Sequence, residues 1–181
     1  MRHKSTLRSD LLAARSALSH EARAAANTAI GQSLLDWCHA QGYLSLAVYW
    51  PIRGEPDLRP VYTALIDAGI ELSLPVVIAP KTPLSFAAWL PGQPMQCDSA
   101  GLPIPAQPQR HLIPDVILLP CVGFNQQRIR LGYGGGFYDR TLATLPTSIA
   151  IGIAFECARS IFDAAAHDIP MHHVITERSM D

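Results

Sequence analysis

The sequence predicts a single α/β domain built around a parallel sheet. From Gly42 onward, short apolar runs alternate with helical stretches, and strands that alternate with helices usually pair in parallel. Two runs, Asp115 to Pro120 and Ser148 to Ala154, are apolar almost throughout, which is typical of central strands covered on both faces. We expect these two strands to be neighbours. The 181 residues have the length of one ordinary domain, so the prediction treats 1–181 as one unit.

Residues 1–40 predict two amino-terminal helices. Leu7 and Leu11 recur at helical spacing in the first segment, and the apolar residues from Ile30 to Cys38 repeat that spacing in the second. Ser19 lies between the two segments and is followed by Glu21, which is the pattern of an N-cap and a first helical turn. The second helix should therefore begin directly after Ser19.

The rest of the chain predicts a series of strands and helices. Gly69 marks the end of one helix, because glycine readily takes the left-handed conformation that terminates helices. The expected elements are a strand at Leu44 to Tyr49, a helix at Leu58 to Ala68, strands at Leu72 to Val77 and Leu84 to Leu90, a helix from about Phe137 to Leu145 and, after a short helix, a final strand around His173 to Thr176.

A stretch from Pro91 to Pro114 contains six prolines and is expected to lack regular structure. A linker between two domains is one interpretation, but too few residues follow it to make a second independent domain. We therefore expect 91–114 to form a long loop around one domain. Long ordered loops often line functional sites.

The composition excludes several classes of protein. Hydrophobic residues make up 49% and charged residues 16%, which argues against disorder. Lys+Arg number 14 and Asp+Glu number 15, a net charge of −1, so no overall field would hold a nucleic-acid backbone or an anionic membrane. We expect neither partner.

The sequence also predicts a cytoplasmic protein. The four cysteines are widely spread and form no CxxC pair, which favours a reducing compartment. The basic amino terminus is interrupted by Asp10 and Arg15, so it lacks the apolar core of a signal peptide. No run approaches the roughly twenty apolar residues that a membrane-spanning helix needs.

The most informative segment is RLGYGGGFYDR, from Arg130 to Arg140, between a buried strand and a helix. Its glycines leave main-chain N–H groups uncovered, and the start of the next helix adds partial positive charge. This combination suits the oxygens of a triphosphate, and Arg130 can add a charge-assisted contact. A tight strand-to-helix turn without a ligand is the alternative, because the segment matches neither GxGxxG nor GxxxxGK[ST].

Charged residues elsewhere can complete a phosphate site. Lys4 and Arg8 lie four apart, so on a helix they share a face and can hold two phosphate groups; a solvated basic face is the alternative. Asp139 and Asp168 are candidate oxygen ligands for Mg²⁺, which binds through one or two carboxylates plus substrate phosphates. Their alternatives are a favourable helix-dipole contact and a turn cap.

Glu55 follows the first predicted strand, at the end where open α/β sheets collect ligands. Its carboxylate can accept paired N–H donors from a heterocycle, or it can cap the next helix together with Asp57. Trp50 can stack on a flat ring or fill the core.

The sequence contains no recognised motif for zinc binding or for acyl-enzyme catalysis. His167, His172 and His173 form HDxxxHH, which has no recognised ligand spacing, so we expect no zinc site. No GxSxG nucleophile elbow occurs, so acyl-enzyme chemistry has no candidate.

Taken together, these segments resemble the 5-formyltetrahydrofolate cyclo-ligase family over almost the full chain. The resemblance rests on KSTLR at Lys4 to Arg8, Y-W-P-x-x-x-E at Tyr49 to Glu55, LPVV at Leu74 to Val77, DVILLPCVGF, RLGYGGGFYDR and HDIPMHHVITE. The long glycine-containing motif is highly specific, whereas the other segments are individually weak. The resemblance implies a three-layer α/β domain with a mostly parallel, Rossmann-like sheet.

The resemblance also implies a role for individual residues. The implied ATP contacts are Lys4, Arg8, Arg130, Leu131, Gly132, Tyr133, Gly134, Gly135, Gly136, Phe137 and Tyr138, with Arg130 as the catalytic residue. The implied folate contacts are Trp50, Glu55, Tyr133, Gly134, Gly135, Gly136 and Phe137, and the implied Mg²⁺ ligands are Asp139 and Asp168. The implied partners are ATP and 5-formyltetrahydrofolate, bound by a monomer or a weak homodimer.

The implied activity is ATP-dependent cyclisation of 5-formyltetrahydrofolate to 5,10-methenyltetrahydrofolate through phosphorylation of the formyl oxygen. Three positions depart from the family pattern: Asn125 replaces a usual Asp, Arg128 a usual turn glycine and His172 a common Asp. These departures leave open a catalytically weak regulator that binds nucleotide and folate. A kinase or ligase with another acceptor is a further alternative.

Overall fold

A seven-stranded sheet lies at the centre of the computed structural model, which describes residues 3–99, 101–107, 110–165 and 168–181. The strand order in the described part of the chain is β11-β10-β7-β1-β2-β3-β6. The strands are β1 (Ser45–Ala47), β2 (Glu71–Val76), β3 (Ser85–Ala88), β6 (His111–Leu112), β7 (Val116–Pro120), β10 (Ile149–Ile153) and β11 (His173–Ile175). The strands from β11 to β2 pair in parallel, and β3 and β6 are antiparallel to their neighbours. The mostly parallel sheet and the pairing of β7 with β10 are both confirmed.

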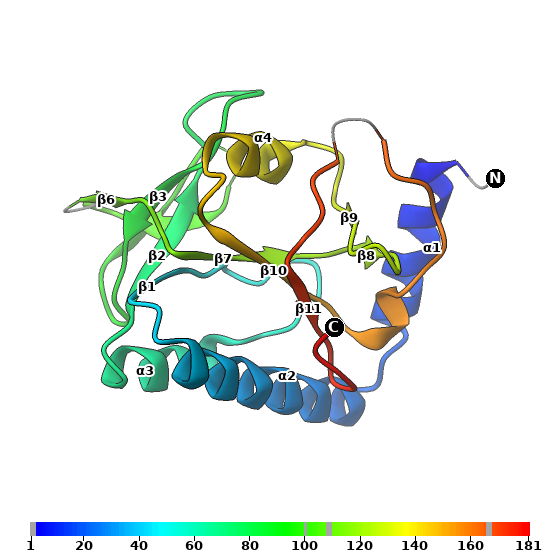
Figure 1. Ribbon diagram of the computed structural model, residues 1–181, viewed down its shortest axis with the longest axis horizontal. Helices are drawn as coiled ribbons and strands as arrows, with labels where there is room; N and C mark the ends of the chain where they lie inside the picture. Colours follow the sequence, from blue (N-terminus) through cyan, green and yellow to red (C-terminus); the bar gives the residue numbers. More distant parts are fainter. Residues whose placement is uncertain (1–2, 100, 108–109, 166–167) are drawn as a thin grey trace.

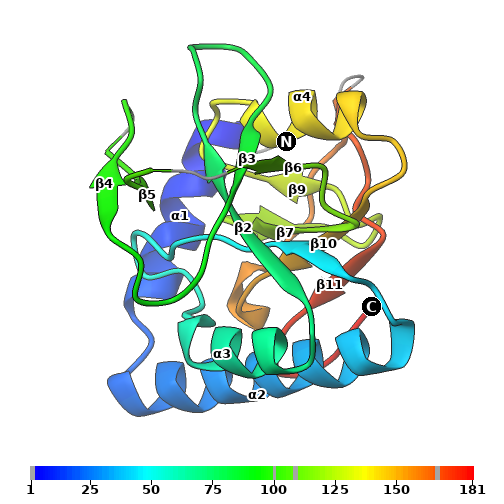
Figure 2. The same ribbon diagram turned by 90° about the vertical axis from the view of Figure 1, so that its left-hand side faces the viewer.

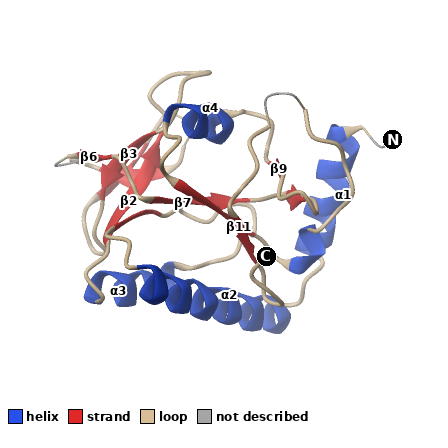
Figure 3. Ribbon diagram, viewed as in Figure 1, coloured by secondary structure: helices blue, strands red, loops and turns tan. Residues whose placement is uncertain are grey.

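Helices cover both faces of this sheet, so the three-layer prediction is confirmed (Figure 1, Figure 3). Helices α2 (His20–Gln41) and α3 (Arg59–Asp67) cover one face, and α4 (Phe137–Thr144) covers the other (Figure 2). Helix α1 (Lys4–Ser16) stands at the end of the sheet, beside the hairpin of β8 (Gly123–Phe124) and β9 (Arg130–Leu131). The short 3₁₀ helix η1 (Glu156–Ala158) also contacts α1. None of the helices described combines the length and the apolar composition needed to span a bilayer.

The helix ends follow the chemistry of their terminal residues. Ser19 is the N-cap of α2, and its hydroxyl accepts a hydrogen bond from the N–H of Ala22 at 3.1 Å. Gly42 ends α2 with φ 71°, and Gly69 follows α3 with φ 84°. The predicted N-cap at Ser19 and the predicted helix end at Gly69 are confirmed.

The core alternates between the two faces of β7. Val116 and Leu118 pack in the cluster that contains Ile30, Leu34 and Tyr62 of the α2 and α3 layer. Ile117 and Leu119 pack in the opposite cluster, beneath α4. Because both faces are covered, all five residues of β7 are buried, which explains its unbroken apolar sequence.

The proline-rich stretch 91–114 is not irregular, and that expectation was wrong. It contains β4 (Met95–Cys97) and β5 (Pro103–Pro105), which form an antiparallel pair, as well as β6. Hydrogen bonds on either side of this pair join Asp98 N to Leu102 O and Ala106 N to Pro94 O. Pro103 and Pro105 alternate with these bonded positions, so their missing N–H groups fall on the outer edge of the ladder. Pro108 lies outside the described residues.

The order of the strands creates a crevice between β1 and β7. The connection from β1 passes through α3 on one face, whereas the connection from β7 passes through α4 on the other. Loops that leave the carboxyl ends of β1 and β7 therefore diverge, which is where open α/β sheets bind ligands. Tyr49, Trp50 and Pro120 lie at this edge.

Thr141 ties α4 to the loop before β3. Its buried hydroxyl accepts from the N–H of Leu84 at 2.8 Å and donates to the carbonyl oxygen of Phe137 at 2.7 Å. Thr141→Val removes the acceptor and leaves the Leu84 N–H without it, so we expect the free energy of unfolding to fall by about 1–3 kcal/mol. Urea denaturation measures this change.

The matched control is Thr144→Val on the same helix. Thr144 is exposed, and its hydroxyl donates to a helix carbonyl. The expected loss is below about 0.5 kcal/mol. Equal losses in the two variants would contradict the special role of the Thr141 contact.

Candidate active site

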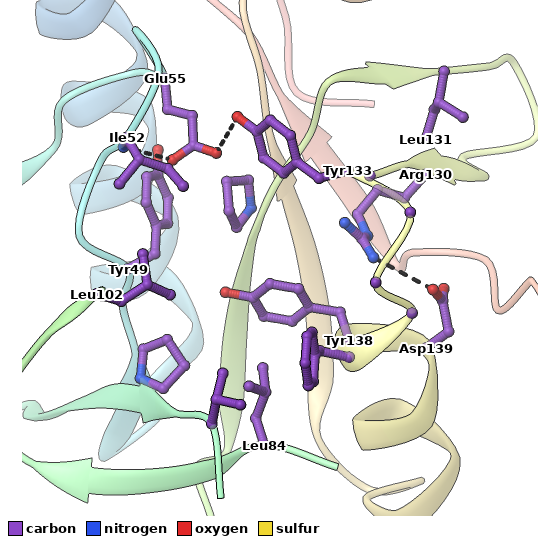
Figure 4. A pocket seen from close by; sticks show the side chains of 18 of the residues that line it. Tyr49, Ile52, Glu55, Leu84, Leu102, Arg130, Leu131, Tyr133, Tyr138 and Asp139 are labelled. Carbon is purple, nitrogen blue, oxygen red and sulfur yellow. Dashed lines mark hydrogen bonds and ion pairs between the residues drawn. The ribbon is translucent and has the colours of Figure 1, made fainter. Parts of the chain in front are cut away.

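A cavity of about 470 Å³ opens at the carboxyl edge of the sheet, and Figure 4 shows part of its lining. Every site residue expected from the sequence lines this cavity. Those residues are Lys4, Arg8, Trp50, Glu55, Arg130, Leu131, Gly132, Tyr133, Gly134, Gly135, Gly136, Phe137, Tyr138, Asp139 and Asp168. One wall comes from the loop after β1, and the facing wall comes from the glycine loop between β9 and α4. Segments from both ends of the chain therefore meet around one space.

The glycine loop needs its glycines for two different reasons. Gly134 and Gly136 have φ values of 98° and 64°, which residues other than glycine rarely adopt. At Gly132 the reason is close approach, because a Cβ there would overlap the guanidinium group of Arg130. An alanine at Gly134 or Gly136 would strain the backbone of the loop, whereas one at Gly132 would displace the Arg130 guanidinium.

Two arginines bind the carbonyl oxygens of this loop. Arg8 Nε donates to Gly132 O at 2.7 Å, and Arg140 Nη2 donates to Gly135 O at 2.5 Å. None of the hydrogen bonds found between described residues uses the main-chain N–H groups of 133–136. These donors, together with the amino terminus of α4, form an environment that suits an anion.

The candidate phosphate-binding cations are paired with the candidate metal-binding acids. Lys4 Nζ lies 2.9 Å from Asp168 Oδ2. Arg130 Nη2 lies 3.4 Å from Asp139 Oδ2 (Figure 4). The Arg130 guanidinium also lies over the ring of Tyr138, at 5.1 Å from its centroid. Ion pairs therefore hold Lys4 and Arg130 at the cavity, and these two side chains do not form a freely solvated basic face.

The acids fit a magnesium ion that is shared with a substrate. Within the described ranges, no three His, Cys, Asp or Glu side chains gather into a closed metal cage. Mg²⁺ usually takes one or two carboxylates and completes its shell with phosphate oxygens and water. Asp139 and Asp168 meet that requirement, because both line the cavity beside the glycine loop.

Glu55 faces the glycine loop from the opposite wall and is 4% exposed. Its Oε2 accepts from the N–H of Ile52 at 2.9 Å, and its Oε1 accepts from the Tyr133 hydroxyl at 2.8 Å (Figure 4). The alternative role as a helix cap is wrong for Glu55, because its oxygens bind Ile52 and Tyr133, whereas Asp57 does accept from the N–H of Arg59 at the start of α3. Glu55 is instead a buried acceptor in the cavity wall.

Burial raises the pKa of the Glu55 carboxyl above its ordinary value. The N–H of Ile52, the hydroxyl of Tyr133 and the charges of Arg15 and Arg130 oppose that shift. Burial, reinforced by the charge of Glu55, raises the pKa of Tyr133 to about 12. At neutral pH the Tyr133 hydroxyl therefore keeps its proton and donates it to Glu55.

Aromatic and apolar side chains shape the rest of the cavity. Trp50 contacts the edge of Trp89, with ring centroids 6.2 Å apart, and also lines the cavity, so it serves the core and the site together. Tyr138 projects from the start of α4 across the cavity (Figure 4). Leu131 packs its side chain with Leu7 in the cluster under α1, and its carbonyl oxygen accepts from the N–H of Val122.

Sequence reasoning missed Arg15, which is 3% exposed behind the cavity wall. Its signal was an arginine in line with Leu7 and Leu11 at intervals of four, on the buried stripe of α1. Reasoning also missed apolar lining residues that come from separate loops: Tyr49, Ile52, Pro75, Val77, Leu84, Leu102, Pro103, Pro120 and Ala165. Their types carry no signal in one sequence, because apolar residues are common throughout the chain.

The unusual residues Asn125, Arg128 and His172 form structural contacts outside the cavity lining. Arg128 has φ 57°, and the Asn125 side chain supports this turn by accepting from the N–H groups of Gln127 and Ile129. His172 Nδ1 accepts from the N–H of Ala150 at 2.9 Å. His167 lies outside the described residues.

The family model described as the 5-formyltetrahydrofolate cyclo-ligase family matches residues 1–177. The chain belongs to this family. A family member from Escherichia coli (strain K12), named 5-formyltetrahydrofolate cyclo-ligase, is 31% identical over 140 residues, 73% of this chain and 77% of the relative. A Haemophilus influenzae protein of the same name is 28% identical over 158 residues, 83% of this chain and 84% of the relative.

Solved structures of cyclo-ligase relatives share the fold. A 5,10-methenyltetrahydrofolate synthetase from Mycoplasma pneumoniae superposes with a TM-score of 0.80 at 27% identity, covering 97% of this chain and 99% of the other. The Aquifex aeolicus 5,10-methenyltetrahydrofolate synthetase gives a TM-score of 0.84 at 28% identity, covering 98% and 91%. The three-layer α/β architecture is therefore that of the cyclo-ligases.

The raised pKa of Glu55 predicts a pH dependence of stability. The folded chain keeps this proton at pH values where the unfolded chain, with an ordinary pKa of about 4.3, has lost it, so stability falls as pH rises through that window. We expect the free energy of unfolding of the wild type, minus that of Glu55→Gln, to decrease from about pH 4 toward neutrality. Urea denaturation at several pH values measures both.

Glu156 supplies a control of opposite sign. Its hydrogen bond with Arg159 lowers the pKa of Glu156, so its contribution is lost as pH falls. The difference between wild type and Glu156→Gln should therefore increase with pH over the same range. Parallel slopes for the two acids would show that burial does not dominate at Glu55.

Proposed function

We propose that this protein catalyses the ATP-dependent cyclisation of 5-formyltetrahydrofolate to 5,10-methenyltetrahydrofolate, with release of ADP and phosphate. The observation that carries the proposal is the cavity itself, in which an anion-binding loop faces a buried carboxylate. A reaction between ATP and a heterocyclic substrate needs both kinds of contact around one space. Family membership supports the same activity.

The nucleotide would lie along the glycine loop from Arg130 to Tyr138. The loop presents N–H groups that use no acceptor among the described residues, and Lys4, Arg8 and Arg130 add positive charge from α1 and β9. These groups can neutralise the charge of a transferring phosphoryl group without forming a covalent bond to it. Arg130 is our candidate catalytic residue, because its guanidinium lies between the loop and the cavity.

The folate would lie against the wall that carries Trp50 and Glu55. The Glu55 carboxylate can accept paired N–H donors of the pterin ring, and Trp50 can stack on that ring. Residues 133–137 would contact the folate from the other side, because the same loop lines both parts of the cavity. The γ-phosphate and the formyl group would thus meet at this loop.

The chemistry then proceeds in two steps. The formyl oxygen attacks the γ-phosphorus, the bond to the β-phosphate oxygen breaks, and ADP leaves. Nitrogen N10 next attacks the activated carbon, the carbon–oxygen bond breaks, phosphate departs with the former formyl oxygen, and the N10 proton is released. Because phosphorylation creates the leaving group, positioning and charge neutralisation supply the main catalytic requirement.

We also propose that Mg²⁺ accompanies ATP and is held by Asp139 and Asp168. When bound, the ion would neutralise phosphate charge, as it does in other phosphoryl transfers. Both walls of the cavity come from one chain, which fits a monomer or a weak homodimer. The four free cysteines fit the expected cytoplasmic location.

The regulator alternative receives no support from the cavity. Arg128 and His172 motivated it, yet both are used in turn and sheet contacts and neither lines the cavity. We therefore keep the enzyme as the proposed function.

A direct assay tests the proposal. The purified protein with ATP, Mg²⁺ and 5-formyltetrahydrofolate should show the absorbance of the methenyl product, and ADP should form in equal amount. Calorimetry with each ligand should detect binding. If both ligands bind and no product forms, the regulator is correct; ADP release with another acceptor and none with this folate would indicate a different ligase or kinase.

Single substitutions should separate the two halves of the site. We expect Lys4→Ala and Arg130→Ala to raise the KM for ATP about tenfold or more through lost charge-assisted contacts, and Glu55→Ala to act mainly on the folate KM. Arg110→Ala is the control, because Arg110 pairs with Glu71 on the exposed edge of the sheet. Equal losses for both ligands in all three site variants would refute separate roles.

A further inference from the structure

We propose that Arg15 is a positioning residue for the folate, acting on the Glu55 carboxylate through the hydroxyl of Tyr133. The inference rests on the proposed function, because it assigns Glu55 to the folate. It adds a residue from α1 that lines no part of the cavity.

Burial of Arg15 needs an explanation beyond packing. Arg15 is 3% exposed and continues the stripe of Leu7 and Leu11, where an apolar side chain would bury more cheaply. Its guanidinium donates to the Tyr133 hydroxyl at 3.1 Å and to the carbonyl oxygen of Cys121. No carboxylate of the described residues forms an ion pair with it. These two hydrogen bonds hold the guanidinium in place, and one of them connects it to Glu55 through the Tyr133 hydroxyl.

The hydrogen bonds between Arg15 and Glu55 have a fixed direction. A guanidinium can donate and cannot accept, whereas an ionised carboxylate accepts and cannot donate. The Tyr133 oxygen must therefore accept from Arg15 and give its own proton to Glu55 Oε1, at 2.8 Å. Because the N–H of Ile52 holds Oε2, both carboxylate oxygens are fixed in place. Arg15 thus selects the orientation of the donor that orients Glu55.

The charge of Arg15 also favours the ionised form of Glu55. The groups that interact electrostatically with this carboxyl come from several elements: Arg15 on α1, Tyr49 after β1, Cys121 after β7, Arg130 on β9, Tyr133 in the glycine loop and Tyr138 on α4. Arg15 and Arg130 are the cations among them, and both oppose the effect of burial. A heterocycle that donates two N–H bonds needs the carboxylate and not the protonated acid.

Arg15 therefore has a second consequence for the site. Lys4, Arg8 and Arg15 all belong to α1, with the first two lining the nucleotide side and the third supporting the folate side. Loss of Arg15 should weaken the folate while leaving the nucleotide contacts of the same helix intact. A purely structural arginine would affect both ligands through the position of α1.

Calorimetry with 5-formyltetrahydrofolate alone, and separately with a non-hydrolysable ATP analogue and Mg²⁺, tests this difference. We expect Arg15→Met to raise the dissociation constant for the folate about tenfold or more and that for the nucleotide less than about twofold. Folate affinity should fall on acidification, and the pH at which it falls (the acidic limb) should be higher in this variant, because Glu55 loses a neighbouring cation. Arg15→Lys should restore part of the pH shift. Arg159→Met, which removes two ion pairs with Glu156 and Asp181 away from the cavity, should change the affinity for neither ligand.

Tyr133→Phe keeps the test decisive if Arg15→Met does not fold, as judged by circular dichroism. This variant retains Arg15 and removes the linking hydroxyl, so folate affinity should fall and the acidic limb should move in the same direction. Adding Arg15→Met to a folded Tyr133→Phe background should cost less than about threefold further, because coupled residues are not additive. Wild-type folate affinity and pH dependence in Tyr133→Phe, or equal loss of both ligands in Arg15→Met, would overturn the proposal. These binding measurements are independent of turnover, so a failure of the catalytic proposal would be recognised separately.

Discussion

The packing of α1 against the β8 and β9 hairpin is the constraint on which the site depends. Leu7 and Leu11 are buried with Val122 and Leu131, so the first helix of the chain is fixed to the strand that begins the glycine loop. Gly123 allows this close approach, because a Cβ there would meet the side chain of Leu11. The apolar contact carries no chemistry of its own. It sets the distance at which Lys4 and Arg8 can act on an anion.

The sequence predicts the local motifs of this site better than the contacts between residues that are distant in the chain. The glycine loop and the Lys4, Arg8 spacing have local signals, because turn formation and helical periodicity are properties of neighbouring residues. The pairing of Lys4 with Asp168 joins residues from opposite ends of the chain, and no local pattern encodes it. The same limit explains the short strands among the prolines, since Pro103 and Pro105 are acceptable only where their nitrogens face away from β4.

Glu55 illustrates a conflict between stability and binding. Its burial raises the pKa of the carboxyl, so keeping it ionised costs free energy in the folded protein. Ile52, Tyr133 and Arg15 reduce that cost through two hydrogen bonds and a nearby charge. A residue chosen for stability alone would be apolar here. The network is what a buried acceptor needs if a ligand is to find it ionised and already oriented.

The two ion pairs at the cavity follow the same logic for the nucleotide. Asp168 and Asp139 neutralise the charges of Lys4 and Arg130 in the free protein. The two cations can therefore be held at the cavity at a modest cost in stability. Under the proposed function, a nucleotide with its metal brings charges of both signs. The phosphates could then pair with Lys4 and Arg130 while the metal pairs with Asp168 and Asp139. No charged group would be left unpaired when these new pairs replace the two ion pairs of the free protein. The arrangement thereby favours the complete metal–nucleotide complex over either component, because a bare triphosphate would displace the carboxylates without replacing their counter-charge.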